Sequence, residues 1–337
     1  MAKTRLPRWS GRREILGLAG MTALAMALPA WKAHAPTRAP AKPSGLAAPG
    51  KAWLIDRPLH QTTVLQSFAF DERNGHLFAL QVMQGGIRLQ DEDRAYSHGE
   101  RARRGDLCLN RLAMNGTVTG YMFLKGFGHG GALGVEAGEH GSILWTEWDA
   151  NPASGYGRGL CRFPFTHGRV LTRNSAELAT YRPIPGSTSN CATLDPGRRR
   201  LLLRYKVHGE PRFALYETDQ FASGAFHPLA DFAQPHTELG LPFQGMALDG
   251  NSVYQLLGSG YGRGNPPSSS GNTRLSRINW RTGTVTRDVL ERTAPALSWR
   301  EPEGLAVRRG DGRGLYVGFA HGPRGRRKFS LYAKELR

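Results

Sequence analysis

The sequence predicts an all-β fold, a five-bladed β-propeller, and three observations support this prediction. A strand–turn–strand pattern recurs five times after residue 60, at intervals of 52 to 66 residues. The 43 glycines and 21 prolines suit a fold with many tight turns. No stretch after residue 50 keeps a helical hydrophobic period over eleven residues. An irregular two-sheet sandwich is the alternative that these observations leave open.

Each copy of the pattern fits the first two strands of a four-stranded sheet. Equivalent points in the five copies are Phe78, Leu144, Leu202, Tyr254 and Tyr316. One such sheet cannot bury both of its faces, whereas five sheets around an axis bury one another's faces. We expect Phe329–Ala333 to pair with Ala52–Ile55, so that an N-terminal strand closes the last blade and removes two exposed edges.

Residues 1–35 have the features of an export signal. Arg12 and Arg13 precede an apolar, uncharged run over 17–30, and Ala33-His-Ala35 supplies a small-x-small cleavage pattern. The arginine pair and the modest hydrophobicity of the run favour the twin-arginine (Tat) route over the general one. Because the run is too short for a good membrane span, we expect a protein that is secreted, either free or associated with the cell wall, with no membrane span in its mature form.

The mature chain is expected to be basic. Residues 36–50 form a Pro/Ala-rich linker that should be disordered, which leaves 51–337 for the propeller domain. The net charge is +18, and after residue 50 there are 37 basic against 26 acidic residues, a surplus of 11. Outside the cell this charge would attract teichoic acids, uronic-acid polymers, phospholipid surfaces or free DNA. A genome whose codons favour arginine is the alternative explanation.

Three cysteines, Cys108, Cys161 and Cys191, are an odd number for an oxidising compartment, so at most one disulfide can form. The chain has no CxxC motif, and Cys108 and Cys161 lie in strand-like segments. We therefore predict buried, reduced cysteines that act as small apolar residues. A bridge between Cys161 and Cys191 is the main alternative.

Polar residues stand where the innermost strand of each blade is expected to begin. They are Gln66, His129, Asn190, Gln244, Glu301 and Glu303. Small residues follow most of them, which would let the strands crowd around the axis while the polar side chains line a wet channel. The alternative is that these groups only hydrogen-bond one another or channel water.

Two identical hexapeptides, Ser154–Gly159 and Ser259–Gly264, each follow a second strand and precede a third. The loops Arg204–Gly209 and Ala320–Gly325 occupy the same place in their blades. Since these loops return to the channel entrance, we expect their aromatic and basic residues to gather there. The residues concerned are Tyr156, Arg158, Tyr205, Tyr261 and Arg263. Tyrosine stacks on sugar faces and arginine binds phosphate or carboxylate, although simple glycine-rich turns would also explain the repeat.

Carboxylates near the entrance could serve a glycosidase, which needs one protonated acid and one ionised carboxylate. The candidates for catalysis are Glu136, Glu147, Asp149, Glu301 and Glu303, with His129. No spacing rule selects two of them, and Glu301 and Glu303 could equally anchor neighbouring blades through backbone N–H groups. Nothing in the chain matches a nucleotide-binding, metal-binding or nucleophile-elbow motif, so we expect no cofactor and no metal.

Short motifs along most of the chain resemble one family. They are Asp106–Arg111, Gly126–Gly130, Gly134–Glu136, Leu144–Glu147, Phe243–Gly245 and Arg300–Gly304. The chain resembles, over roughly residues 60–336, actinobacterial exported proteins labelled teichoic acid biosynthesis protein C. Their propeller is similar to those of phage receptor-binding proteins and helveticin-like bacteriocins. The resemblance implies a five-bladed propeller that engages cell-wall glycans, plausibly teichoic acid, and supplies no catalytic residues.

These observations predict a secreted, monomeric propeller that binds an anionic cell-wall or extracellular polysaccharide at its channel entrance. The predicted binding residues are Gln66, His129, Asn190, Gln244, Glu303, Tyr156, Arg158, Tyr205, Tyr261 and Arg263. A glycan-cleaving enzyme that uses two of the carboxylates is the alternative function. A propeller that binds a protein partner through the same loops is a third possibility, and no nucleic acid is expected.

Overall fold

The computed structural model describes residues 45–269 and 271–336. The predicted export signal, and the linker as far as residue 44, lie outside this range. Residues 45–50, which the sequence assigns to the linker, begin with the 3-10 helix η1 (Gly45–Ala47), whose Leu46 is buried in the core. Among the described residues, no helix combines the length and apolar character that crossing a membrane requires.

The strands form five separate sheets. Blade 1 contains β2 (Leu65–Asp71), β3 (His76–Val82), β4 (Leu107–Ala113), β5 (Val118–Lys125) and β9 (Val170–Thr172). Blade 2 contains β6 (Gly134–Gly138), β7 (Gly141–Ala150), β8 (Gly157–Pro164) and β10 (Ala179–Tyr181), and blade 3 contains β11 (Thr188–Asp195), β12 (Arg200–Val207), β13 (Glu210–Glu217) and β14 (Ala230–Ala233). Blade 4 contains β15 (Phe243–Asp249), β16 (Ser252–Leu257), β17 (Arg274–Asn279) and β18 (Thr284–Leu290). Blade 5 contains β19 (Glu301–Arg308), β20 (Gly314–His321), β21 (Lys328–Lys334) and β1 (Lys51–Arg57).

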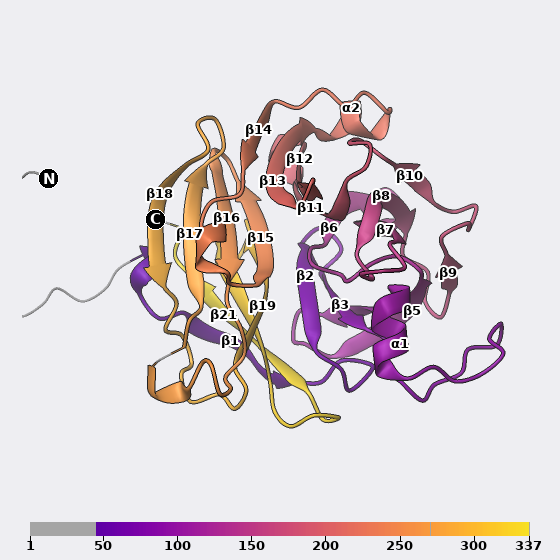
Figure 1. Ribbon diagram of the computed structural model, residues 1–337, viewed down its shortest axis with the longest axis horizontal. Helices are drawn as coiled ribbons and strands as arrows, with labels where there is room; N and C mark the ends of the chain where they lie inside the picture. Colours follow the sequence, from indigo (N-terminus) through magenta and orange to yellow (C-terminus); the bar gives the residue numbers. More distant parts are fainter. Residues whose placement is uncertain (1–44, 270, 337) are drawn as a thin grey trace, which may run out of the picture. The chain divides into compact units, whose positions relative to one another are not determined.

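The five sheets surround a common axis, which confirms the propeller (Figure 1). The first strand of each blade is innermost, and β2, β6, β11, β15 and β19 contact one another in turn around the ring. Besides η1, the helices of the described residues are short: α1 (His98–Arg104), α2 (Thr218–Ala222) and the 3-10 helices η2 (Pro196–Arg198), η3 (Thr237–Leu239) and η4 (Pro267–Ser269). Every recurring segment in the sequence forms the first hairpin of a blade.

The predicted closure is confirmed. Strand β1 pairs antiparallel with β21, with Ala52 opposite Tyr332 and Leu54 opposite Leu331. Both leucines are buried in the same core cluster. The two ends of the folded part therefore share one sheet, in which β1 covers the edge of β21 and is itself the outermost strand.

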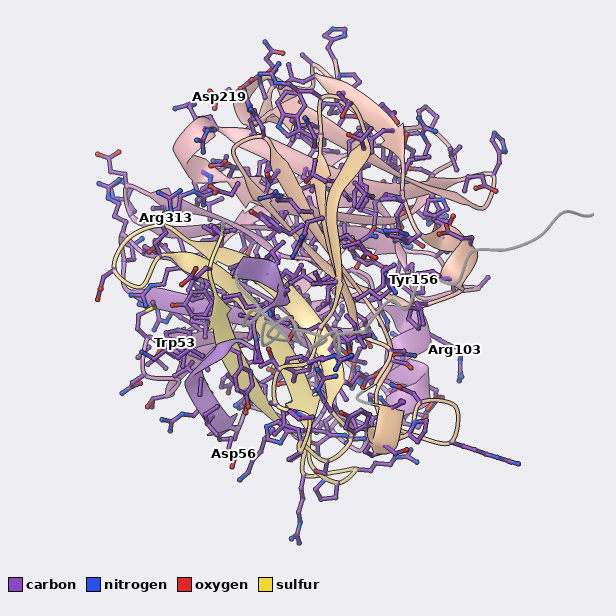
Figure 2. The ribbon with its side chains drawn as sticks, turned by 90° about the vertical axis from the view of Figure 1, so that its left-hand side faces the viewer. Trp53, Asp56, Arg103, Tyr156, Asp219 and Arg313 are labelled. Carbon is purple, nitrogen blue, oxygen red and sulfur yellow. The ribbon has the colours of Figure 1, made fainter. Side chains whose placement is uncertain are left out.

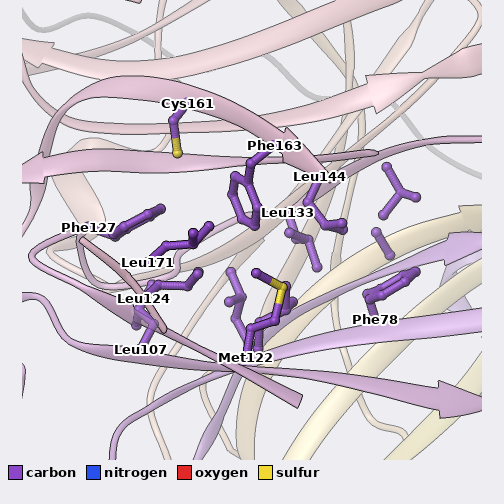
Figure 3. Close-up of a cluster of buried hydrophobic side chains, with 14 of the residues drawn as sticks. Phe78, Leu107, Met122, Leu124, Phe127, Leu133, Leu144, Cys161, Phe163 and Leu171 are labelled. Atoms are coloured by element: carbon purple, nitrogen blue, oxygen red, sulfur yellow. The ribbon is translucent and has the colours of Figure 1, made fainter. Parts of the chain in front are cut away.

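Apolar side chains fill the space between neighbouring blades. The cluster between blades 1 and 2 brings Phe78 and Met122 against Leu144 and Phe163 (Figure 3). Each large side chain buried in this way contributes roughly 1.5–3 kcal/mol. Cys161 belongs to this cluster, so it behaves as the small apolar residue that the sequence predicts.

All three cysteines are buried and free, and the alternative bridge between Cys161 and Cys191 is not formed. Burial raises the pKa of the Cys191 thiol to about 12, and burial likewise raises the pKa of Cys108 and of Cys161. Thiols with raised pKa carry almost no thiolate near neutral pH, so they are poor nucleophiles.

Because the inner strands all run in the same direction, the propeller has an entrance face, where these strands begin, and an exit face, where they end. Arg103 of α1 and Tyr156 of the β7–β8 loop lie on the same side of the molecule (Figure 2). Arg313, in the turn between β19 and β20, lies on the opposite side. The entrance face therefore carries both α1 and the predicted binding loops.

Candidate ligand-binding site at the channel entrance

A cavity of about 670 Å³ opens on the entrance face. Blades 2 and 3, together with the loop that leads into blade 4, supply its walls. The lining residues that bear on ligand binding are His129, Glu147, Tyr156, Cys191, Arg204 and Phe243. Its size is within the range of sites for small ligands, and its chemistry is mixed aromatic and polar.

Glu147, on β7, holds two walls of this cavity together. One carboxylate oxygen accepts the backbone N–H groups of His129, at 3.0 Å, and Gly157, at 2.8 Å. The other oxygen accepts those of Gly130, at 2.9 Å, and Gly131, at 2.8 Å. The side chain is buried, so four charge-assisted hydrogen bonds form away from water. This geometry gives Glu147 a structural role: it positions the segments that carry His129 and Tyr156.

His129 and Tyr156 form an aromatic wall. Their ring centroids lie 4.8 Å apart with an interplanar angle of 34°. Tyr156 is 36% exposed, so one part of its ring remains available to a ligand. Burial lowers the pKa of His129, although the carboxylates of Glu147 and Glu301 oppose that shift. The histidine is therefore mainly neutral near pH 7, and the wall offers aromatic stacking to the apolar face of a sugar.

Arg204, on β12, supplies a buried positive charge to the cavity. The residue is only 7% exposed, and its guanidinium lies over the ring of Phe243 at 4.1 Å from the centroid. Its Nε donates to the side-chain oxygen of Gln234 at 2.7 Å. Burial lowers its pKa, but an arginine remains protonated in proteins.

No carboxylate in the described part of the chain forms an ion pair with Arg204, although buried charges in proteins are normally paired. The buried guanidinium has given up most of its hydration, and the carboxylate of Glu147 acts on it only from beyond ion-pair distance. An anionic group in the cavity would supply a paired opposite charge, and a phosphate or carboxylate could accept two parallel N–H bonds from the guanidinium.

A carboxylic acid lies at the start of β19, near the same opening. Burial, together with the charge of Glu301, raises the pKa of Glu303 well above its usual range. Glu301 instead accepts a hydrogen bond from the indole N–H of Trp299 at 2.7 Å. Trp299 is exposed and has a φ of 68°, an uncommon backbone conformation for a non-glycine residue. Burial raises the pKa of Tyr156, and the charges of Glu147 and, to a smaller extent, of Glu303 add to that shift.

Residues 64–333 match the family described as the phage 5-bladed β-propeller receptor-binding platform domain. The chain belongs to this family. It is 27% identical over 279 residues to the putative major teichoic acid biosynthesis protein C of Bacillus subtilis (strain 168). The aligned region covers 80% of this chain and 59% of that relative. These matches confirm the resemblance on which the sequence interpretation relied.

Among solved structures, the tail fibre of Staphylococcus aureus phage P68 superposes with a TM-score of 0.65 at 16% identity, covering 85% of this chain and 52% of the fibre chain. The chain therefore spans a little over half the length of both relatives. The GH43_1 enzyme from Xanthomonas citri in complex with xylose has a TM-score of 0.44 at 12% identity, over 83% of this chain and 90% of the enzyme. A likeness of that size carries no functional argument.

Three of the predicted channel residues of this propeller hydrogen-bond to backbone groups. Gln244 donates to the carbonyl of Gly258 at 2.9 Å. Asn190 is buried and donates to the carbonyl of Gly157 and to a serine hydroxyl. Gln66 is also buried and contacts the carbonyl of Leu65 at 3.4 Å. These amides therefore bond to backbone carbonyls or to a serine and not to one another, and contact of the three with a ligand stays a prediction.

The two hexapeptides have different surroundings in this propeller. Tyr156 lines the cavity, whereas Tyr261 is buried and donates to the carbonyl of Pro295 at 3.1 Å. Arg158 forms an ion pair with Asp149 at 2.8 Å, and Arg263 is exposed. The expectation that both loops bring tyrosine and arginine to one cavity therefore holds for Tyr156 alone, because only the first loop is short enough to end at the cavity wall.

The alternation of side chains along β12 explains why Tyr205, which we expected at the cavity, does not line it. Tyr205 is buried and its hydroxyl donates to Asp231 at 2.7 Å, on blade 3. Its neighbours Arg204 and Lys206 line the cavity instead, since successive side chains of β12 point to opposite faces. Sequence reasoning named the loop but missed Arg204, for which a charge directly after the buried run Leu201–Leu203 was the available signal.

The remaining carboxylate candidates lie outside this cavity. Glu136 accepts from the indole of Trp145 at 2.9 Å and from Arg162 at 2.7 Å. Asp149 is surrounded by arginines. In the described ranges there is also no cluster of three or more histidine, cysteine or acidic residues that could hold a metal ion.

Proposed function

We propose that this propeller binds an anionic cell-wall or extracellular polysaccharide, of the teichoic-acid type, in its entrance cavity. The observation that carries the proposal is the buried Arg204 guanidinium, which has no carboxylate partner among the described residues. A ligand phosphate or carboxylate would become that partner. The matching family is described as a receptor-binding domain, and the Bacillus subtilis relative is named for teichoic acid biosynthesis. Both descriptions support the same class of ligand.

Part of the lining suits a sugar that carries one negative charge, and Lys206 adds to the positive charge, although Glu210 and Glu238 also line the cavity. The ring of Tyr156, backed by His129, would stack on the apolar face of the sugar or polyol. Burial and the charge of Glu301 raise the pKa of Glu303, which favours its neutral form and lessens its repulsion of an anion. With the predicted export signal, this arrangement corresponds to a secreted protein that works at a cell surface, and we propose that it acts as a monomer.

Arg204→Gln tests the proposal. Charged hydrogen bonds contribute about 1.5–3 kcal/mol each, so losing one or two corresponds to an affinity for purified wall teichoic acid lower by about tenfold or more. Arg263→Gln, an exposed arginine outside the cavity, is the matched control. Titration calorimetry measures both, and circular dichroism checks that Arg204→Gln is folded. Tyr156→Ala, at an exposed position, provides a second route if it is not. Unchanged affinity in both cavity variants would overturn the proposal.

Glycan cleavage is the second candidate function. The observation that favours it is the pair of neighbouring acids on β19, Glu303 with a raised pKa and Glu301 beside it. A protonated acid next to a second carboxyl group is the arrangement that glycosidases use. Incubation with wall polymer should then release new reducing ends, and Glu303→Gln should stop their release while polymer binding remains. Binding of the polymer without any change in its chain length would contradict cleavage, and binding would then be the function.

A further inference from the structure

A second cavity, of about 680 Å³, lies beside the first on the entrance face. The two share their dividing walls. Gly126 lines the second cavity and His129 the first, and the β7–β8 loop contributes Pro152 to the second and Tyr156 to the first. Three residues of extended chain span at most about 11 Å, so the wall between Gly126 and His129 is thin. One polymeric ligand could therefore reach both cavities.

The second cavity borders an arginine cluster with surplus positive charge. Asp149 is the shared partner of three arginines: Arg158, at 2.8 Å, Arg173, at 3.7 Å, and Arg182. The carboxylate is buried, whereas the three arginine side chains are 39% to 58% exposed. One carboxylate neutralises one guanidinium, so about two positive charges remain at this point of the surface. Arg173 lines the second cavity directly.

The opposite wall of this cavity is also basic. Arg103 and Arg104, on α1, and Lys125, at the end of β5, all line it. Arg104 and Lys125 are already paired, Arg104 with Asp106 at 3.4 Å and Lys125 with Asp91 at 2.7 Å. Arg103 forms no ion pair with another described residue, whereas Glu100, which also lines the cavity, pairs with Arg94. Glu92 and Asp106 both pair with the buried Arg101. That buried ion-pair group fixes α1 to the edge of blade 1. This group therefore holds α1, and with it Arg103, beside the cavity.

We infer that this second cavity, with the arginine cluster on Asp149, is a second anion subsite. The inference rests on the proposed function and specifies the ligand further: a polymer with an anionic group, phosphodiester or uronate, in successive repeats. One anionic group would bind Arg204, and another group of the same chain would bind between Arg103 and Arg173. Linked binding of this kind raises affinity with chain length, because the second contact is made at high effective concentration.

The test uses three probes with the full chain: sn-glycerol 3-phosphate, poly(glycerol phosphate) of defined length, and oligogalacturonate. The variant is the double substitution Arg103→Gln and Arg173→Gln, at two exposed positions where folding is not at stake. Its control is Arg263→Gln with Arg313→Gln, which removes the same charge elsewhere on the surface. We expect the double variant to bind the long polymer about tenfold or more weakly while its affinity for the single phosphate stays unchanged.

Arg204→Gln separates the two ideas. It should weaken binding of the single phosphate and of the polymer alike. If it does so while the Arg103 and Arg173 variant keeps the full polymer affinity, the second subsite is wrong and the proposed function stands. If Arg204→Gln changes neither affinity, the proposed function fails. Tighter binding of poly(glycerol phosphate) than of oligogalacturonate would identify phosphodiester as the group recognised, and the reverse order would identify uronate.

Discussion

Replacing Glu147 with glutamine separates a structural carboxylate from a catalytic one. In the native protein each carboxylate oxygen accepts two backbone N–H groups, four in all, at 2.8 to 3.0 Å. Glutamine has nearly the same shape, but an NH₂ group replaces one oxygen. Whichever way the amide turns, two buried N–H donors then face another donor and lose their acceptor.

The size of the effect follows from this count. A hydrogen bond to a charged group contributes about 1.5–3 kcal/mol, so two lost bonds correspond to a decrease of about 3–6 kcal/mol in the free energy of unfolding. Typical domains have about 5–15 kcal/mol in total, so the loss would be severe. Glu136→Gln is the matched control, because Glu136 and its partner Arg162 are 24% and 38% exposed. Solvent-screened pairs of this kind contribute about 1 kcal/mol or less.

Urea unfolding followed by tryptophan fluorescence measures both variants, with stability taken from the midpoint and slope. Binding of wall polymer is measured in parallel below the unfolding transition. The Glu147 variant should lose affinity as well, because His129 and Tyr156 lose their common anchor. A free energy of unfolding within 1 kcal/mol of the wild type, or no larger a loss than in Glu136→Gln, would refute this reasoning.

Three further predictions concern other buried groups. Because burial raises the pKa of Glu303, the stability that this acid contributes is present below about pH 4.5 and is lost as the pH rises through the raised pKa. In Glu303→Gln, the urea midpoint should no longer fall over this pH range. A pH profile of the midpoint that is the same as in the wild type would contradict this prediction. Leu331→Ala, in the strand that closes the ring, should lower the free energy of unfolding by about 2–5 kcal/mol, and a loss below 1 kcal/mol in urea titrations would argue against closure by β1 and β21. Maleimide should not label Cys108, Cys161 or Cys191 in the native protein and should label all three in urea. The mass of the labelled protein should be the same with and without prior treatment with reductant. Two cysteines that stay unlabelled in urea would indicate a disulfide.

Repetition in the sequence was enough to predict the ring of blades, because each blade starts with a hairpin of buried, alternating strands. The outer strands were less accessible. Strands β9 and β10 have only three residues each, too few for an alternating pattern to be distinguished from a loop. The addition of β9 in parallel to blade 1 depends on a chain return from blade 2, which no local pattern encodes.

The candidate site was predicted in part, for a reason that lies in geometry. His129 and Tyr156 were expected at the entrance and do meet there. The identical second hexapeptide behaves differently because its loop is longer: residues 258–273 separate β16 and β17, whereas 151–156 separate β7 and β8. In the longer loop, Tyr261 turns inward to the carbonyl of Pro295. Repeat position therefore predicts the face on which a residue lies, while loop length decides what its side chain contacts.

Whether Glu147 and Glu303 are structural or reactive depends on the groups around them, and the acidic residues in the sequence do not indicate those groups. The segment over 128–131 is rich in glycine, and a Cβ atom at Gly128 would lie 2.3 Å from a carboxylate oxygen of Glu147. Glycine is therefore required there because the backbone must approach the carboxylate closely enough to donate its N–H groups. A glycine-rich segment next to a strand with an acidic residue thus indicates an anchored carboxylate. For Glu303, in contrast, burial and the charge of Glu301 raise the pKa, which favours the neutral acid.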